Sequence, residues 1–219
     1  MWKNFKLCVA RWFPEHISPR LVVVAYVILD FLTIVGRRRI SRNFNHNMAH
    51  FMEEKTPLSS GYIENQNQWG DIHFGRTTMA FAGCEVIAVY NVMKALGRNA
   101  GPELIAQLIS NFERRGAALQ GWIGTSPMAL KKYLNKNGIN TRLVWREEDL
   151  SDAKVAIATI YNDRNNLYSQ IHTIAFTREE NGYTAHNSVY RVTEKGSLRE
   201  AVGAVSSAPK LICAIEILE

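Results

Sequence analysis

The chain has 219 residues, of which 47% are hydrophobic and 21% charged; this composition supports a substantial core and excludes a disordered chain. Its three cysteines, Cys8, Cys84 and Cys213, are an odd number at wide spacings, which excludes a disulfide framework and favours a reducing, cytoplasmic compartment. The net charge is +6, but residues 1–60 carry nine Lys and Arg against four Asp and Glu. The rest of the chain is therefore nearly neutral, and we expect no nucleic-acid partner.

Residues 1–59 are predicted to form a basic, apolar helical extension. Within them, LVVVAYVILDFLTIVG (21–36) is a sixteen-residue run with Arg20 before it and three arginines after it. A membrane span usually needs about 20 apolar residues, and a run of about 10 to 14 is more typical of a buried helix. Two interpretations stay open: a helix that packs on the protein or on a partner protein, and a helix that associates with a membrane. A cleaved signal is disfavoured, because the run starts late and no small-residue cleavage site follows it.

Residues 60–219 are predicted to form the main domain, entered through the linker-like stretch EEKTPLSSG (53–61). A polar and aromatic loop (62–75) leads to a helix that starts near Cys84 and is apolar on almost every face, which is typical of a central core helix. A second helix opens with Pro102, and a third begins at Pro127, with Ser126 as its expected cap and Gly138 just past its end.

The second part of the domain is predicted to be a sheet. Its expected strands are TRLVW (141–145), VAIATIY (155–161), SQIHTIAF (169–176), GYTAHNSVYRV (182–192) and KLICAIEIL (210–218). Helices come first and strands follow, which indicates an α+β fold with a mainly antiparallel sheet.

Three residues suggest thiol chemistry. Cys84 stands at the start of an apolar helix, where unpaired N–H groups and the helix dipole favour a thiolate. His172 lies in one predicted strand and Asn187 in the next, so the two strands are expected to form a hairpin. A side-chain amide that bonds one imidazole nitrogen would orient the ring while the other nitrogen faces the sulfur.

The register of that hairpin decides whether His172 and Asn187 touch. A loop centred between Glu179 and Glu180 would pair them directly. A two-residue type I′ turn at Asn181-Gly182 would instead separate them by about 13 Å. We expect the longer loop, and the alternative stays open.

The segment NQNQWGDIHFGRTTMAFAGCEVIAVYNVMKAL (65–96) resembles the start of papain-like cysteine peptidases of the bacteriocin-processing, double-glycine leader group. A Gln-containing stretch, a Trp, an aromatic-Gly pair and a Gly-Cys at a helix start recur there in that order. GTSPMALKKYLNKNG (124–138) and the later HTIAF and YTAHNS continue the pattern, so the resemblance covers residues 60–219. It implies a papain-like fold whose helical half carries the nucleophile and whose sheet half carries the histidine.

The resemblance also implies roles for individual residues. Cys84 would be the nucleophile, His172 the general base and acid, Asn187 the residue that orients it, and Gln66 the oxyanion donor, with Gln68 competing for that last role. The expected function is hydrolysis of a peptide bond, with leader-peptide processing as one use.

The expected substrate-binding residues are Trp69, Phe74 and Gly83, although both aromatic side chains could instead close the core. Glu85 departs from the family pattern, which commonly has a small residue there, and a carboxylate so close would oppose formation of a thiolate. It favours one alternative, a catalytically silent peptide-binding module. The other alternative is an acyltransferase or amidase of the same fold.

No cofactor or metal is expected. His46 and His50 share a helix face, but they lack the glutamate of the H-E-x-x-H zinc motif and an evident third ligand.

Overall fold

The computed structural model describes residues 2–53, 61–98, 100–163, 165, 170–188, 190, 196–207 and 209–218. The linker predicted for residues 53–61 falls mostly outside the described residues. Three helices precede the main domain: α1 (Trp2–His16), α2 (Pro19–Leu32) and α3 (Arg37–Met52). Pro19 at the start of α2 suits a first helical position, where a missing N–H costs no hydrogen bond. In the described part of the chain no single helix is long and apolar enough to cross a membrane; α2 and α3 meet the length and composition test only as a pair bent by 104°.

The N-terminal helices pack on the rest of the protein. Val35, in the segment between α2 and α3, and Ile40 and Phe51 of α3 belong to the main hydrophobic cluster. Val22, Val23 and Tyr26 of α2 form a smaller cluster with the ends of the sheet strands. The extension therefore contributes to the core of the molecule, and residues 21–36 include a helix that packs on the domain with one face.

The helical half follows the order predicted from the sequence. Its elements are η1 (Gln66–Trp69), β1 (His73–Phe74), β2 (Thr77–Thr78), α4 (Met79–Ala82), α5 (Cys84–Ala95), α6 (Pro102–Arg114), η2 (Ala118–Gly121) and α7 (Pro127–Lys136). Helix α5 is buried over most of its length, as its all-round apolar sequence predicts. The third helix begins after Ser126 as expected, but the Ser126 side chain makes no cap hydrogen bond and its hydroxyl is buried without a partner among the described residues.

The sheet half contains five strands in the order β3-β7-β4-β5-β6, and all of its neighbouring pairs are antiparallel. The strands are β3 (Asn140–Val144), β4 (Val155–Tyr161), β5 (Ile171–Glu179), β6 (Gly182–His186) and β7 (Lys210–Leu218), with the short helix η3 (Glu147–Asp149) after β3. The predicted α+β class with a mainly antiparallel sheet is confirmed.

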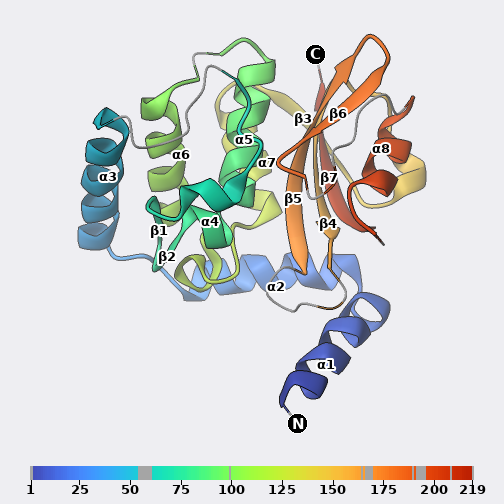
Figure 1. Ribbon diagram of the computed structural model, residues 1–219, viewed down its shortest axis with the longest axis horizontal. Helices are drawn as coiled ribbons and strands as arrows, with labels where there is room; N and C mark the ends of the chain where they lie inside the picture. The colour runs from blue at the N-terminus through green and yellow to red at the C-terminus, as the bar shows by residue number, and fades with distance from the viewer. Residues whose placement is uncertain are drawn as a thin grey trace.

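Helices cover both faces of this sheet. Figure 1 shows α3 to α7 on one side of it, α8 (Leu198–Ala204) on the other, and α2 crossing beneath the helices and the sheet. Successive side chains of a strand point to opposite faces of the sheet, so each strand packs on both layers of helices. Ile157 and Ala175 face the cluster that contains α5, whereas Ala158 and Ile174 face the cluster that contains α8.

Helix α8 was not predicted from the sequence, although a local signal for it exists. Ser197 accepts a hydrogen bond from the Glu200 backbone N–H, and the Glu200 carboxylate accepts one from the Ser197 N–H. This reciprocal pair is a capping box, which marks a helix start in sequence as Ser-x-x-Glu.

The hairpin of β5 and β6 has neither of the two predicted registers. Glu179 pairs with Gly182, so the turn residues are Glu180 and Asn181. A type I′ turn at Asn181-Gly182 needs a positive φ at both residues, and only Gly182 has one, at 140°. Strand β6 then ends at His186, and Asn187 leaves it with φ of 60°. The expected direct pairing of His172 with Asn187 is therefore wrong.

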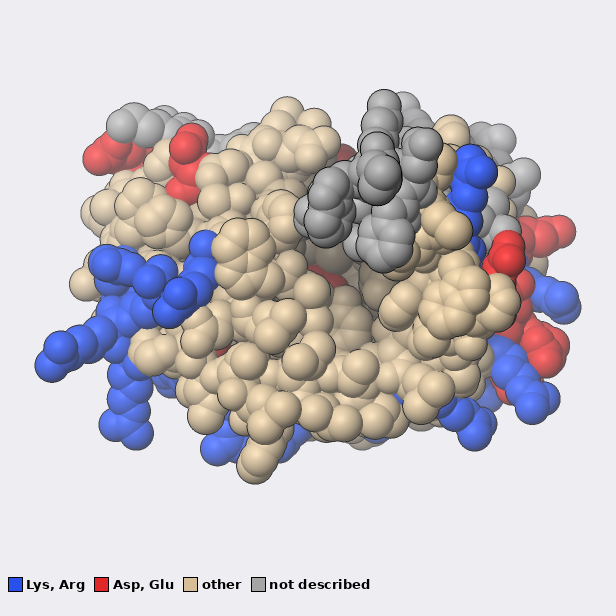
Figure 2. Space-filling view, turned by 90° about the horizontal axis from the view of Figure 1, so that it is seen from below, with Lys and Arg blue, Asp and Glu red and all other residues tan. Residues whose placement is uncertain are grey.

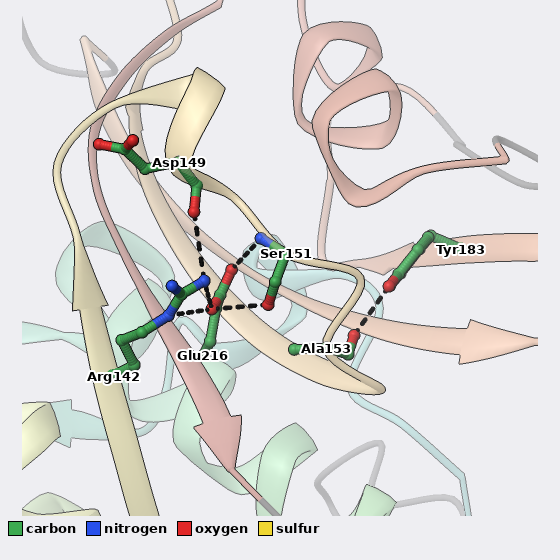
Figure 3. A network of polar contacts seen from close by, with 6 residues as sticks. All are labelled: Arg142, Asp149, Ser151, Ala153, Tyr183 and Glu216. Carbon is green, nitrogen blue, oxygen red and sulfur yellow. Dashed lines mark hydrogen bonds and ion pairs between the residues drawn. The ribbon is translucent and has the colours of Figure 1, made fainter.

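A buried glutamate ties β3, β7 and the loop after η3 together (Figure 3). Glu216 of β7 is fully buried, and its Oε2 atom accepts hydrogen bonds from Arg142 Nε (2.8 Å) and Nη2 (2.6 Å). Ser151 donates its backbone N–H to Glu216 Oε1 (2.6 Å) and its hydroxyl to Oε2 (2.9 Å). The carboxylate is thus paired with a charge and fully hydrogen-bonded, which is what a buried ion needs.

We expect Glu216→Ala to lower the free energy of unfolding by about 1 to 3 kcal/mol, because it leaves the Ser151 N–H without its buried partner, whereas Arg142, 45% exposed, can turn to water. Urea unfolding measures this. The matched control is Glu148→Ala, which removes the exposed 3.8 Å ion pair with Arg146 and should cost less than about 1 kcal/mol. Equal losses in the two variants would contradict a structural role for the Glu216 network.

Candidate active site

Cys84 is the first residue of α5, directly after the short helix α4. Gly83 joins the two helices, and a Cβ there would lie 2.5 Å from the Met79 carbonyl oxygen and 2.7 Å from its sulfur. Glycine is therefore required by close packing at this junction. Among the described residues the backbone N–H of Cys84 has no hydrogen-bond partner, as expected for the first turn of a helix. That N–H is free to receive a ligand oxygen.

The Cys84 thiol is held neutral by its surroundings. Its side chain is only 7% exposed, and burial is the largest cause that raises the Cys84 pKa well above its usual value, followed by the negative charge of Glu85. Burial also raises the pKa of Glu85 to about 7. The Glu85 carboxyl lies against Gly124, where a Cβ would stand 2.7 Å from its Oε1 atom. A carboxyl next to the thiol is the environment that the sequence analysis identified as opposing a thiolate.

Helix α2 lies near this pair of residues. Tyr26 is 7% exposed and packs with Tyr161 and Cys213. Burial raises the pKa of its hydroxyl well above the usual value, and nearby Glu85 and Cys84 raise it further, in that order. The Tyr26 hydroxyl therefore lies within electrostatic reach of the buried thiol and carboxyl. The helix also packs on η2 and β7, so it closes the molecule beneath the N-terminus of α5 (Figure 1).

The His172 ring is oriented by a backbone atom of Asn187. His172 Nε2 lies 2.6 Å from the Asn187 carbonyl oxygen. A carbonyl can only accept, so Nε2 carries the proton, and in the neutral ring Nδ1 is the free base. Among the described residues no hydrogen bond reaches Nδ1. Burial lowers the pKa of His172, which also favours the neutral ring, and the Asn187 carbonyl opposes this shift.

The predicted contact between the Asn187 side chain and His172 is replaced by this backbone contact. The hairpin register would place residue 187 opposite Ile174, and the left-handed turn at Asn187 directs its carbonyl toward the ring instead. Asn187 tolerates that positive φ better than most residues. The asparagine still orients the histidine, but with its main chain.

The Asn187 side chain binds Gln66. The Gln66 backbone N–H donates to Asn187 Oδ1 (2.9 Å), and Asn187 Nδ2 donates to Gln66 Oε1 (3.3 Å). Gln66 Nε2 in turn donates to the Ala80 carbonyl oxygen (3.0 Å) in α4. Gln66 thus connects the asparagine with the helix that precedes Cys84, whereas Gln68 is exposed. Of the two glutamines that competed for the oxyanion role, only Gln66 contacts another predicted site residue.

Sequence reasoning missed a group of residues that holds this arrangement. Glu64 Oε2 accepts the Asn187 backbone N–H (3.0 Å), and Glu64 Oε1 accepts the His186 Nδ1–H (2.7 Å). Thr177 Oγ1 lies 2.8 Å from His186 Nε2, and Tyr62 stacks on the His186 ring at 3.9 Å. The Glu64 carboxylate therefore holds His186, the last residue of β6, and Asn187, the residue that follows it. The available signal in the sequence was a second histidine directly before Asn187: strand alternation directs His186 to the opposite face from its neighbour.

Trp69 and Phe74 lie in the core. Both belong to the main cluster and are almost completely buried. In this structure they close the core, which is the second of the two roles considered for them. Gly83, the third expected substrate-binding residue, lies at the close-packed junction between α4 and α5.

Cys84 and His172 approach the same strand, β5, from its two faces: Thr173 shares its face with Ala175, which packs in the cluster of α5, whereas His172 shares its face with Ile174, which packs in the cluster of α8. Strand β6 pairs with β5 only from Ala175 onward, so the edge of β5 at His172 and Thr173 is left to other elements. The Thr173 backbone N–H interacts with the Cys84 sulfur and lowers the Cys84 pKa, although less than burial and Glu85 raise it. Among the described residues no hydrogen bond joins the sulfur to the His172 ring. The thiol lies near the Thr173 backbone, and the His172 side chain is on the opposite face of the strand; both groups are neutral.

Comparison with protein-family models, with curated proteins and with solved structures found no match for this chain. Among the described residues no three His, Cys, Asp or Glu side chains converge on a common metal position. His46 and His50 are 6.3 Å apart, and His46 stacks on His73 at 3.9 Å.

Proposed function

We propose that the protein is a cysteine peptidase with a papain-like arrangement, held here in a latent form. The observations that support this proposal are a cysteine at the start of the core helix α5, which packs on β5, and a histidine in β5 whose Nε2–H is bound by the Asn187 carbonyl. Thiol hydrolysis needs a thiol of this kind and an oriented neutral imidazole of this kind in contact with each other.

The proposed reaction uses groups already present at this edge. His172 Nδ1 takes the proton of Cys84, and the thiolate attacks the scissile carbonyl carbon. The unpaired Cys84 N–H stabilises the oxyanion, joined by Gln66 Nε2 once it leaves the Ala80 carbonyl. His172 then protonates the departing amine, and water, deprotonated by His172, releases the acyl group and restores the thiol.

Latency follows from two features of the structure. No hydrogen bond joins the described thiol and ring, and His172 shares the face of Ile174, opposite α5, so the end of β5 must rearrange before the proton can move. A peptide can reach a 7% exposed cysteine only if covering segments move, and the Tyr26 hydroxyl of α2 lies within electrostatic reach of it. We therefore propose that displacement of α2 opens the site. As the substrate we propose a precursor whose leader peptide is removed.

The test is hydrolysis of a mixed peptide library, followed by mass spectrometry, with the otherwise wild-type protein and three variants, all carrying Tyr26→Ala to loosen α2. Cys84→Ala and His172→Ala should each lower the rate by about a thousandfold or more. Cys213→Ala removes another buried free thiol and should hydrolyse at the wild-type rate. A Cys84→Ala protein that cleaves as fast as the wild type would refute the proposal. Transfer of the acyl group to an added amine would identify an acyltransferase that uses the same thioester chemistry.

The second candidate is a catalytically silent peptide-binding module. The buried Glu85 carboxyl favours it, because it raises the Cys84 pKa. In a silent module Cys84 should resist alkylation until the protein unfolds, also in variants with substitutions in α2.

A further inference from the structure

Helix α2 presents a continuous apolar face to solvent on the side opposite Val22, Val23 and Tyr26. Its exposed members recur at helical spacing, and Phe31 is 83% exposed. They are Leu21, Val24, Val27, Ile28, Phe31 and Leu32, followed by Ile34. Exposed apolar residues scattered singly need no explanation, but a contiguous set marks an interaction site.

The charges of α2 are arranged around this face. Asp30 is the only acid in the helix, and its carboxylate is turned inward, where it accepts the backbone N–H of Gly116. Arg20 precedes the apolar residues, and Arg37 and Arg38 follow them, all three exposed. Figure 2 shows the molecule from below: no acidic side chain projects from the middle of this face, and Lys and Arg side chains project at its margins.

Neighbouring elements widen the apolar face. Helix α2 packs against η2, and Trp122, the residue after η2, is exposed and makes an edge contact with exposed Phe81 at 5.8 Å. Exposed tryptophan and phenylalanine beside basic residues are typical of protein surfaces at the headgroup level of a bilayer.

The length of α2 decides how it could meet a bilayer. Its 14 residues extend about 21 Å, which is shorter than the roughly 30 Å hydrocarbon core. Its buried face holds the core residues Val22, Val23 and Tyr26, so the helix can use only its outer side. A helix of this kind lies parallel to the membrane surface, with the apolar side at the acyl boundary and the arginines on the phosphates.

We propose that the outer face of α2 binds the surface of an anionic lipid bilayer. The occupant is a membrane rather than a protein because basic residues stand at both ends of an apolar face that contains no exposed acid. This inference does not depend on the proposed peptidase activity, because its test measures binding only.

The test is co-sedimentation of the full chain with vesicles of phosphatidylcholine alone, or with about 30% phosphatidylglycerol. We expect at least about tenfold stronger binding to the anionic vesicles, lost largely in about 0.5 M NaCl, with a blue shift of tryptophan fluorescence. The double variant Ile28→Ser/Phe31→Ser should lower binding at least tenfold, and Arg37→Glu/Arg38→Glu should remove the preference for anionic lipid. The control Met52→Ser changes a 79% exposed residue of α3 and should bind as the wild type.

Three outcomes would overturn the proposal. The wild type could fail to bind either vesicle, or the Ile28→Ser/Phe31→Ser protein could bind as well as the wild type. Alternatively, light scattering could show a wild-type dimer that this double variant converts to a monomer, without vesicle binding, which would assign the face to a second copy of the chain. The changed residues are exposed, so circular dichroism should show unchanged folding.

Discussion

The Tyr26→Ala variant is expected to react with iodoacetamide at Cys84 at least about tenfold faster than the wild type, because removal of a buried aromatic ring opens the cover over the thiol. Tyr26 is buried in the α2 cluster and lies near both Cys84 and Glu85. The measurement is the rate of alkylation at each cysteine, obtained by peptide mass spectrometry.

The other two cysteines are internal references for this experiment. Cys8 is exposed and Cys213 is buried, so Cys8 should be alkylated rapidly in every variant. Cys213 should stay slow unless the whole protein unfolds, which separates local opening from global unfolding. Val27→Ala, on the exposed side of the same helix, should leave the Cys84 rate unchanged. Equal Cys84 rates in Tyr26→Ala and Val27→Ala would show that core atoms, and not α2, enclose the thiol.

Glu85→Gln is expected to remove a pH-dependent loss of stability. The Glu85 pKa is raised by burial from 4.5 to about 7, so between these values the folded protein keeps a proton that the unfolded chain releases. The free energy of unfolding contributed by this group therefore falls as the pH rises from about 4.5 to about 7, by about 3 kcal/mol in all. Urea unfolding from pH 4.5 to 8 should show a smaller decrease for the variant.

Glu113→Gln is the matched control. Burial raises the Glu113 pKa to about 7 as well, so this variant should flatten the stability profile in the same direction. Glu113 binds Asn43 and the Gly75 N–H and does not appear among the groups that shift the Cys84 pKa. Only Glu85→Gln should therefore speed alkylation of Cys84 at pH 8, by about fivefold or more, since it removes a neighbouring carboxylate. Faster alkylation in both variants would indicate general loosening of the fold.

Much of the architecture was predictable, because the spacing of apolar residues along the chain indicates which residues of a helix or strand are buried. The all-round apolar sequence after Cys84 predicts a central helix, and α5 is one. Four of the five predicted strands match described strands closely; the fourth in chain order, GYTAHNSVYRV, ends early at His186. It ends there because Asn187 adopts a left-handed conformation, which a local pattern of apolar residues does not encode.

The candidate site was predictable in its residue types but not in its contacts. The sequence places a cysteine at a helix start and a histidine and an asparagine on adjacent strands. A shift in hairpin register moves every cross-strand partner, so the contact of His172 with the Asn187 carbonyl, and of the Asn187 side chain with Gln66, could not be predicted. The clamp by Glu64 joins residues far apart in the chain and depends on how the entering segment packs on β6.

The sequence alone determined the order of helices and strands, the basic apolar extension and the position of one thiol at the start of a core helix, because these depend on local composition and on the periods of helix and strand. Only the tertiary structure decided that α2 divides its apolar residues between two environments, with Tyr26 buried against Tyr161 and Cys213 and Phe31 turned to solvent. A run of apolar residues in the sequence indicates how much apolar surface gains from burial. Which part of that surface is buried depends on the shape of the folded remainder of the chain.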